Sequence, residues 1–354
     1  MSEFAHLKSR WPKVVMGLAA GVTAGFLFNW LQTPLPWMIG PMVVIGTANL
    51  LGAELDILPY GRQGGQLFIG TGVGLYFTPP VLAALLSYAG WILAGGCMVM
   101  VIAAAGGLML AKVSGIDRTS CFFATVPGGA AEMAFLAERH GGSVPAVAIA
   151  QSVRVAMLVL IIPPLLTYSG LADIDRASAR VVQTVVPDQL ALLLALSAIS
   201  AVLFVLFKLQ NPWMMGSLIG TAALTAFGLE LSAVPSELTN TGQILLASAL
   251  GARFERAFFL RHRMFIPFAL INATFLLIAC AGLAFVCAWL SGLPVDTLIV
   301  GLAPGGLAEM SITAQALNLG VSMVTAFQLV RIVLANFASP TMFRVIQKIG
   351  GGSV

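Results

Sequence analysis

The stretch PGGAAEM at residues 127–133 recurs as PGGLAEM at residues 304–310, an offset of 177 (304 minus 127). Around these motifs, residues 125–154 and 302–331 share 12 identities over 30 ungapped positions. Chance matching of apolar segments would favour Leu and Val, whereas the shared residues include Pro, Gly and Glu. The chain is therefore interpreted as a duplication, since self-similarity at a fixed offset indicates a repeated structural unit.

The duplication extends beyond the motif, because the same offset carries Gln151 onto Gln328 and Arg154 onto Arg331. We expect a first repeat over residues 1–176 with a Gly-broken segment at 119–138. The second repeat is expected over residues 177–354, with its broken segment at 296–316.

The composition excludes a soluble globule. Of 354 residues, 59% are hydrophobic and only 9% are charged, against roughly 25% charged in an average soluble domain. Long apolar runs favour helices over a barrel, whose strands alternate in and out over about 10 residues. The expected fold is an all-α polytopic membrane protein.

Polar composition also narrows the function. The net charge of +4 is typical of membrane topology, and no basic cluster interleaved with aromatic residues predicts nucleic-acid binding. The four cysteines lack a C-x-x-C spacing and the three histidines are far apart. No metal centre, no cofactor and no enzymatic activity are therefore expected.

The parity of membrane crossings decides the topology. Apolar segments fall at about 12–30, 36–53, 63–78, 81–111 and 143–168 in the first half, and at about 188–207, 212–229, 239–252, 264–290 and 320–343 in the second. If each broken segment enters and leaves on one side, each half makes five crossings and the halves are inverted. With the N-terminus inside, fourteen loop lysines and arginines are then cytoplasmic and only Arg176 and Arg180 lie outside.

Six crossings per half would make the halves parallel and divide these charges ten to six, with the Arg253 to Arg263 cluster on the wrong face. The positive-inside rule therefore predicts ten spans, two re-entrant broken helices and inverted repeats in a bacterial inner membrane. The lipid bilayer is the surrounding partner, and both termini are expected in the cytoplasm.

Four charged residues fall inside the predicted spans: Glu132 with Arg154, and Glu309 with Arg331, each pair separated by 22 positions (154 minus 132). A charge at bilayer depth costs about 2.5 to 3.5 kcal/mol on the lenient insertion scale, so these residues need partners or a wet cavity. They either form two structural ion pairs or line a central site. In the second case Glu carries a proton or cation and Arg anchors an anion.

The backbone of the motif favours a site. Proline fixes φ and lacks an N–H, and adjacent glycines open conformations closed to other residues, so the helix is interrupted here. Interrupted backbone in a membrane is tolerated where it lines a cavity, and the helix that follows presents free amides that attract an anion. Close helix packing is the simpler explanation of the glycines. The candidate substrate- and ion-binding residues are Pro127, Gly128, Gly129, Glu132, Gln151, Arg154, Pro304, Gly305, Gly306, Glu309, Gln328 and Arg331.

The doubled P-G-G-x-A-E-M motif followed by Q-x-x-R in each half closely resembles the duplicated AbrB-type membrane protein family. Members have been labelled ammonia monooxygenases or regulators. The inverted five-plus-five arrangement is more distantly similar to cation/proton antiporters and to bile-acid or organic-anion symporters. That similarity implies a transporter with alternating access and supplies no substrate.

The expected function is secondary transport of a small organic anion, coupled to a proton or cation, with a homodimer as a further expectation. The alternatives are a non-transporting membrane regulator or assembly partner, and a membrane channel or enzyme.

Overall fold

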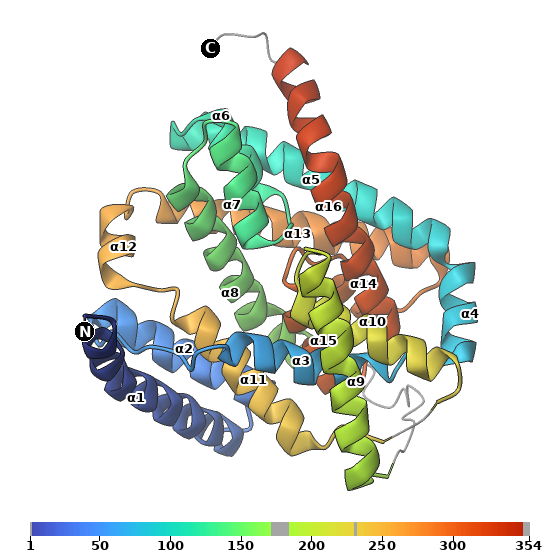
Figure 1. Ribbon diagram of the computed structural model, residues 1–354. Coiled ribbons are helices and arrows are strands. Elements are labelled where there is room, and N and C mark those ends of the chain that lie inside the picture. The colour runs from blue at the N-terminus through green and yellow to red at the C-terminus, as the bar shows by residue number, and fades with distance from the viewer. Residues whose placement is uncertain (1, 171–183, 230–231, 350–354) are drawn as a thin grey trace. The chain divides into compact units, whose positions relative to one another are not determined.

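The computed structural model describes residues 2–170, 184–229 and 232–349, and all regular secondary structure in these ranges is helical (Figure 1). The protein is a polytopic all-α membrane protein. In chain order its helices are α1 (Ser2–Trp30), α2 (Pro36–Leu51), α3 (Gly61–Gly74), α4 (Pro79–Ser87), α5 (Ala89–Ser114), α6 (Arg118–Thr125), α7 (Ala130–Arg139), α8 (Val144–Tyr168), α9 (Pro187–Leu206), α10 (Pro212–Ala226), α11 (Ser236–Gly251), α12 (Arg256–Arg261), α13 (Ile266–Ser291), α14 (Val295–Leu302), α15 (Leu307–Ala316) and α16 (Val321–Ile349).

Helix boundaries follow the sequence offset. Helix α13 is α5 displaced by 177 residues (266 minus 89) with the same length, and α14 and α15 stand in the same relation to α6 and α7. Short helices α4 and α12 also begin 177 residues apart (256 minus 79). The predicted outer loop that carries Arg176 and Arg180 lies outside the described residues.

Fewer helices have full spanning length than the ten predicted crossings. Within the described residues six helices are long and apolar enough to cross a membrane, or seven if the bent pair α3 and α4, at 86°, counts as one span. Helices α2, α3, α10 and α11 have 14 to 16 residues, which reach at most about 24 Å against a hydrocarbon core of about 30 Å. Helix α2 is short because it begins at Pro36 and ends at Gly52, whose φ of 101° suits glycine.

The apolar run at 81–111, expected as one segment, is divided. Helix α4 ends at Ser87, and Tyr88, with φ −99° and ψ 6°, separates it from α5. Apolar composition alone does not reveal such a bend, because both sides of it are equally hydrophobic.

The chain forms two compact units, each assembled from both halves of the sequence. Unit 1 comprises Met1–Ala84, Pro163–Arg261 and Ser311–Ser322, and unit 2 comprises Leu85–Ile162, His262–Met310 and Met323–Val354. Within unit 1, α1 packs on α2 and α9 packs on α10, while α3 crosses α11. Helices from the two sequence halves also pack on one another, an arrangement that we call exchanged packing. Helix α11 of the second half packs on α2 of the first, and α10 of the second half packs on α3 of the first.

Two equivalent glycines make the exchanged contacts in unit 1. A Cβ on Gly74 would lie 2.8 Å from the carbonyl oxygen of Leu218 in α10, and a Cβ on Gly251 would lie 2.9 Å from that of Met42 in α2. Leu218 and Met42 are themselves equivalent at the offset of 176 (218 minus 42). The absence of a side chain on these glycines therefore allows the same backbone approach twice.

The course of α3 and α11 orients the two halves of unit 1. Helix α11 leads from the loop after α10 to the end of α2, where Gly251 contacts Gly46 and Arg256 lies beside Gly52. Helix α3 leads from the loop after α2 to α10, which it meets at Leu218. The last residues of α11 and α3 therefore contact equivalent parts of α2 and α10, as a two-fold relation between the two halves predicts.

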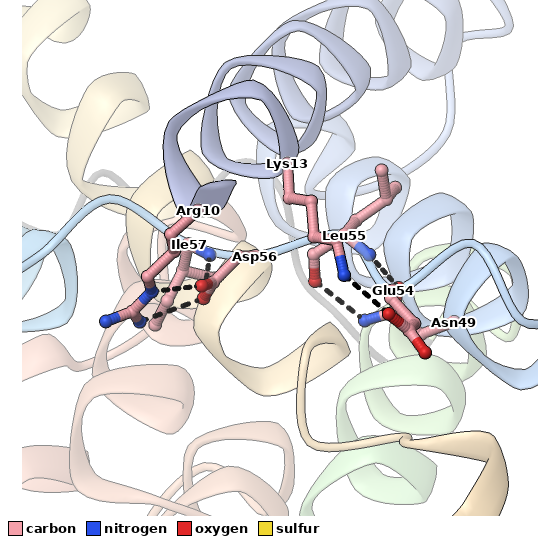
Figure 2. A network of polar contacts seen from close by, with 7 residues as sticks. All are labelled: Arg10, Lys13, Asn49, Glu54, Leu55, Asp56 and Ile57. Atoms are coloured by element: carbon pink, nitrogen blue, oxygen red, sulfur yellow. Dashed lines mark hydrogen bonds and ion pairs between the residues drawn. The ribbon is translucent and has the colours of Figure 1, made fainter. Parts of the chain in front are cut away.

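A polar network ties the loop after α2 to the start of α1 (Figure 2). Arg10 forms an ion pair with Asp56, and Lys13 Nζ lies 2.5 Å from a carboxylate oxygen of Glu54. Asn49 brackets the loop, since its side chain accepts from Leu55 N at 2.6 Å and donates to Leu55 O at 3.0 Å. The loop therefore lies at the same end of unit 1 as the basic start of α1.

Asp56 makes this end of unit 1 sensitive to acid. The hydrogen bond from Arg10 holds the pKa of Asp56 below its ordinary 3.8, although partial burial opposes the shift. A lowered pKa contributes stability that is full above pH 3.8 and is lost as the pH falls through the folded-state value. We expect Asp56→Asn to reduce stability at pH 7 by about 0.5 to 1 kcal/mol.

The measurement is thermal unfolding of wild type and Asp56→Asn in detergent across pH, with the exposed Glu138→Gln as control. The difference from wild type is expected to shrink below pH 3.8. A difference that stays constant over the whole range would show that the ion pair does not hold the loop.

Unit 2 is organised around the glycines of α5. A Cβ on Gly107 would lie 2.8 Å from Thr125 Oγ1 and 3.0 Å from the Cα of Phe122, so α6 packs directly on the α5 backbone. Gly95 lies in the same way against Leu302 of α14 and Phe327 of α16. Helix α5 thus supports both broken segments, and it also packs against its equivalent α13.

Candidate functional site

Each Pro-Gly-Gly motif interrupts a helix in unit 2. Helix α6 ends at Thr125 and α7 begins at Ala130, and α14 and α15 are divided at the equivalent positions. Val126, with φ −59° and ψ 124°, and Ala303, with φ −56° and ψ 133°, are extended. The reason is local, because each precedes a proline and the proline ring disfavours the helical conformation of the residue before it. The predicted breaks therefore fall where the motif places them.

The first glycine of each motif makes room for the motif's methionine. A Cβ on Gly128 would lie 2.6 Å from Met133 Cε, and a Cβ on Gly305 would lie 2.8 Å from Met310 Cγ. Both methionine side chains are fully buried. The first glycine therefore makes room for a buried side chain of the motif itself. Among the described residues, the atoms nearest to such a Cβ belong to this methionine rather than to the closely packed neighbouring helix that the simpler explanation proposed.

The second glycine makes room for the motif's glutamate. A Cβ on Gly129 would lie 1.9 Å from Glu132 Oε2, and a Cβ on Gly306 would lie 1.9 Å from Glu309 Oε2. Each carboxylate is thus folded back over the residue that precedes the new helix. No L-amino acid with a side chain fits at these two positions unless the carboxylate moves.

This position is the positive end of the second half-helix. Met133 N donates to Gly129 O at 2.9 Å and Met310 N donates to Gly306 O at 3.0 Å, so the glycines are the caps and the glutamates are the third helical residues. A carboxylate at the third position is placed as in a capping box, where it serves the otherwise unpaired amides of the first turn. The negative charge is also stabilised by the helix dipole.

Glutamine side chains hold the opposite, carbonyl end of each first half-helix. Gln151 Nε2 donates to Val126 O at 2.9 Å and to Phe123 O at 3.0 Å. Gln328 Nε2 donates to the equivalent oxygens, of Ala303 at 3.0 Å and Val300 at 2.9 Å. Val126 O and Ala303 O also accept from Gly128 N at 2.9 Å and from Gly305 N at 2.8 Å. Phe123 O and Val300 O lack the usual helical donor, because the residues four positions on are the prolines of the motif, so there the glutamines satisfy groups that the break leaves open.

The arginines bind the same carbonyl ends. Arg154 donates to Thr125 O at 3.0 Å and to the Gln151 side chain at 2.7 Å. Arg331 donates to Ala303 O at 2.5 Å and to Gly305 O at 2.6 Å. A cation is favourable at the negative end of a half-helix, which explains why guanidinium groups occupy these positions.

The charged residues of the two motifs do not simply form two Glu–Arg salt bridges. Arg154 makes its hydrogen bonds to Thr125 and Gln151, and Glu132 forms no ion pair with it among the described residues. Arg331 does interact electrostatically with Glu309. The twelve predicted residues come together at the two breaks, but their roles divide between a carbonyl end and an amide end.

The two arginines are also close to one another. Arg154 lies within electrostatic range of Arg331, and both guanidinium groups interact with Cys280 of α13. Both side chains are 2% exposed, and the Nε of each has no hydrogen-bond partner. Buried like charges with unused donors form a positive centre that a negatively charged ligand would complement.

Cys280 is the neighbour that sequence reasoning missed. Its equivalent at the offset of 177 is Ala103 (280 minus 177), so the duplication carried no signal for it. It lies in an apolar run, where a cysteine is ordinarily a small buried side chain.

Comparison with known proteins agrees with the doubled motif. The family model described as "Transition state regulatory protein AbrB" matches residues 37–347. The chain belongs to the AbrB family. Two relatives are similar over nearly their whole length. "Uncharacterized protein YhjN" of Bacillus subtilis (strain 168) is 24% identical over 361 residues, which cover 94% of this chain and 93% of the relative. "Putative regulator AbrB" of Escherichia coli (strain K12) is 24% identical over 327 residues, which cover 92% and 93%.

The matched residues include both Pro-Gly-Gly breaks and both Gln-x-x-Arg helices. The resemblance that the motifs indicated is therefore confirmed for this AbrB family chain.

Proposed function

We propose that this AbrB family protein is a secondary transporter for a small organic anion, coupled to a proton or another cation. The observation that carries the proposal is the pair of neighbouring buried arginines, each with an unpartnered Nε, beside two broken helices. Charged groups inside a membrane protein mark substrate and ion pathways by default. Broken helices are where transporters of other folds bind their substrates.

Two further features support transport. The chain is divided into two compact units that each draw on both halves, which is compatible with transport by alternating access. The course of α3 and α11 suits inverted repeats, which supports ten crossings, and the distribution of loop charges supports both termini in the cytoplasm of a bacterial inner membrane. The cargo partners are then an anion and a coupling ion, and a homodimer is the proposed assembly.

A regulatory function is the second candidate, since the family description and the name of the Escherichia coli relative both say regulator. A regulator that only assembles with other proteins needs no small anion, so ligand binding separates the two candidates.

The test is thermal unfolding of the purified chain with acetate, lactate, malonate, succinate and citrate. Ligand that binds only the folded state stabilises it by about 2.7 kcal/mol at a concentration of 100 Kd. We expect at least one carboxylate to raise the Tm with a saturating concentration dependence, and sodium chloride of equal ionic strength to leave it unchanged. Equal responses to all salts would favour the regulatory candidate.

A further inference from the structure

The identity of the coupling ion can be inferred from the groups that bind at the second helix break, between α14 and α15. This break has a carbonyl end, where α14 stops, and an amide end, where α15 begins. In other transporters with broken helices, exposed carbonyl groups at half-helix ends coordinate Na⁺. Here Gln328 binds the oxygens of Val300, Gly301 and Ala303. Arg331 binds Ala303 O and Gly305 O. A metal cation would have to displace these donors and would face the guanidinium charge, so this end is unsuited to Na⁺.

The amide end of the same break is filled by an anion of the chain itself. The Glu309 carboxylate is folded over Gly306, the cap of the ten-residue helix α15. A substrate carboxylate that bound the first amides of this helix would meet the Glu309 charge at close range. Removal of that charge by a proton is therefore a condition for anion binding at this end.

An independent observation indicates a ligand here. The Arg331 guanidinium that reaches Gly305, next to the cap of α15, keeps a buried Nε without a partner. Gln328 Oε1 is buried and unpartnered as well. In the first half, Arg154 instead turns its second donor to Gln151. Arg154 Nε is unpartnered as well, but only in the second break does the arginine reach the residue next to the cap of the second half-helix.

Resting on the proposed function, we infer that Glu309 is a built-in counter-anion at the start of α15, and that the protein is a proton–anion symporter. The ionised carboxylate occupies the amide end when no substrate is bound. On one side of the membrane Glu309 takes up one proton and a substrate carboxylate replaces it at the amides and at Arg331. On the other side both are released, so one proton and one anion cross together.

The other charged and titratable groups around Glu309 favour this exchange. On the packed helices these are Arg331 of α16, Arg154 of α8 and Cys280 of α13, which interact with one another. Asp296 lies at the far end of α14, a whole half-helix from the break. The positive charge of the arginines favours a bound anion in every state of the cycle. When Glu309 is ionised it is that anion, and when Glu309 is protonated the substrate carboxylate replaces it.

The test uses the full-length protein and whichever carboxylate of the panel above raises the Tm. Its affinity is expected to increase up to about tenfold for each pH unit of acidification, because one proton is taken up. Glu309→Gln, which is neutral at every pH, is expected to bind the anion with a pH-independent affinity. The exposed Glu237→Gln is the control and retains the wild-type dependence.

A second measurement does not need the variant to fold. In wild-type vesicles containing a pH dye, an inward gradient of the carboxylate is expected to acidify the lumen equally in sodium and in choline buffer. The inference would be overturned by a requirement for sodium or by a wild-type anion affinity that does not change with pH. It would also be overturned if Glu132→Gln, and not Glu309→Gln, removed the pH dependence of anion affinity. The proposed transport function would stand in each of these cases. Failure of every carboxylate to bind at any pH would overturn the proposed function itself.

Discussion

Replacement of Arg331 by methionine is expected to destabilise the protein by about 1 to 3 kcal/mol. The substitution removes the donors to Ala303 O and Gly305 O. Ala303 O keeps Gln328 Nε2 and Gly305 N as donors, whereas Gly305 O is left open, which costs about 1 to 3 kcal/mol for a buried acceptor. Relief from burying a cation offsets part of this loss. Arg331→Lys is expected to recover only part of the stability, since an ammonium lacks the planar fork that reaches two carbonyl groups.

The measurement is the midpoint of thermal or denaturant unfolding in detergent, with Arg344→Met as the matched control. Arg344 lies on the same helix, is exposed, and donates only to neighbouring residues of α16. A change within about 0.5 kcal/mol is expected for this control. If Arg331→Met were as stable as wild type, the guanidinium would not hold the break, and its burial would need a purely functional explanation.

Gly251→Ala is expected to destabilise unit 1 by about 1 to 3 kcal/mol, as overpacking of a close contact does. The added methyl group would lie 2.9 Å from Met42 O and 3.1 Å from Gly46 N. These are backbone atoms of α2 and cannot rotate away. The equivalent Gly74→Ala is expected to act in the same direction, because its Cβ would meet Leu218 O and Ala222 N of α10.

The control is Gly282→Ala in α13, where a Cβ meets no atom within 4 Å. Alanine is the better helix former by about 1 kcal/mol, so this variant should be neutral or more stable. The readout is the Tm together with the monodisperse fraction on size exclusion. Tolerance of both Gly251→Ala and Gly74→Ala would contradict the exchanged packing of the two halves.

Much of this architecture could be predicted from the offset of 177. The motif at 127–133 fixes where each helix breaks, because a proline constrains the residue before it whatever surrounds the chain. Apolar composition similarly predicted a helical membrane protein. What escaped prediction is the bend at Tyr88, which divides the apolar run expected at 81–111, because both sides of it are equally hydrophobic.

The site shows the same division. Sequence analysis selected Glu132, Arg154 and their equivalents because charges do not belong in lipid, but it left open whether each Glu pairs with its Arg or lines a site. The structure gives the glutamates to the amide ends and the arginines to the carbonyl ends. Spacing along the chain could not distinguish these arrangements, since both place the same residues at the same breaks.

The central claim is that the chain moves a small organic anion, and solute counterflow in reconstituted vesicles tests it most directly. Vesicles loaded with a carboxylate that raises the Tm are diluted into a trace of the same labelled compound. The account predicts transient, saturable accumulation of label in wild-type vesicles and none in vesicles without protein. Label that only equilibrates, without overshoot or saturation, would indicate a channel and contradict the account, as would the absence of any flux.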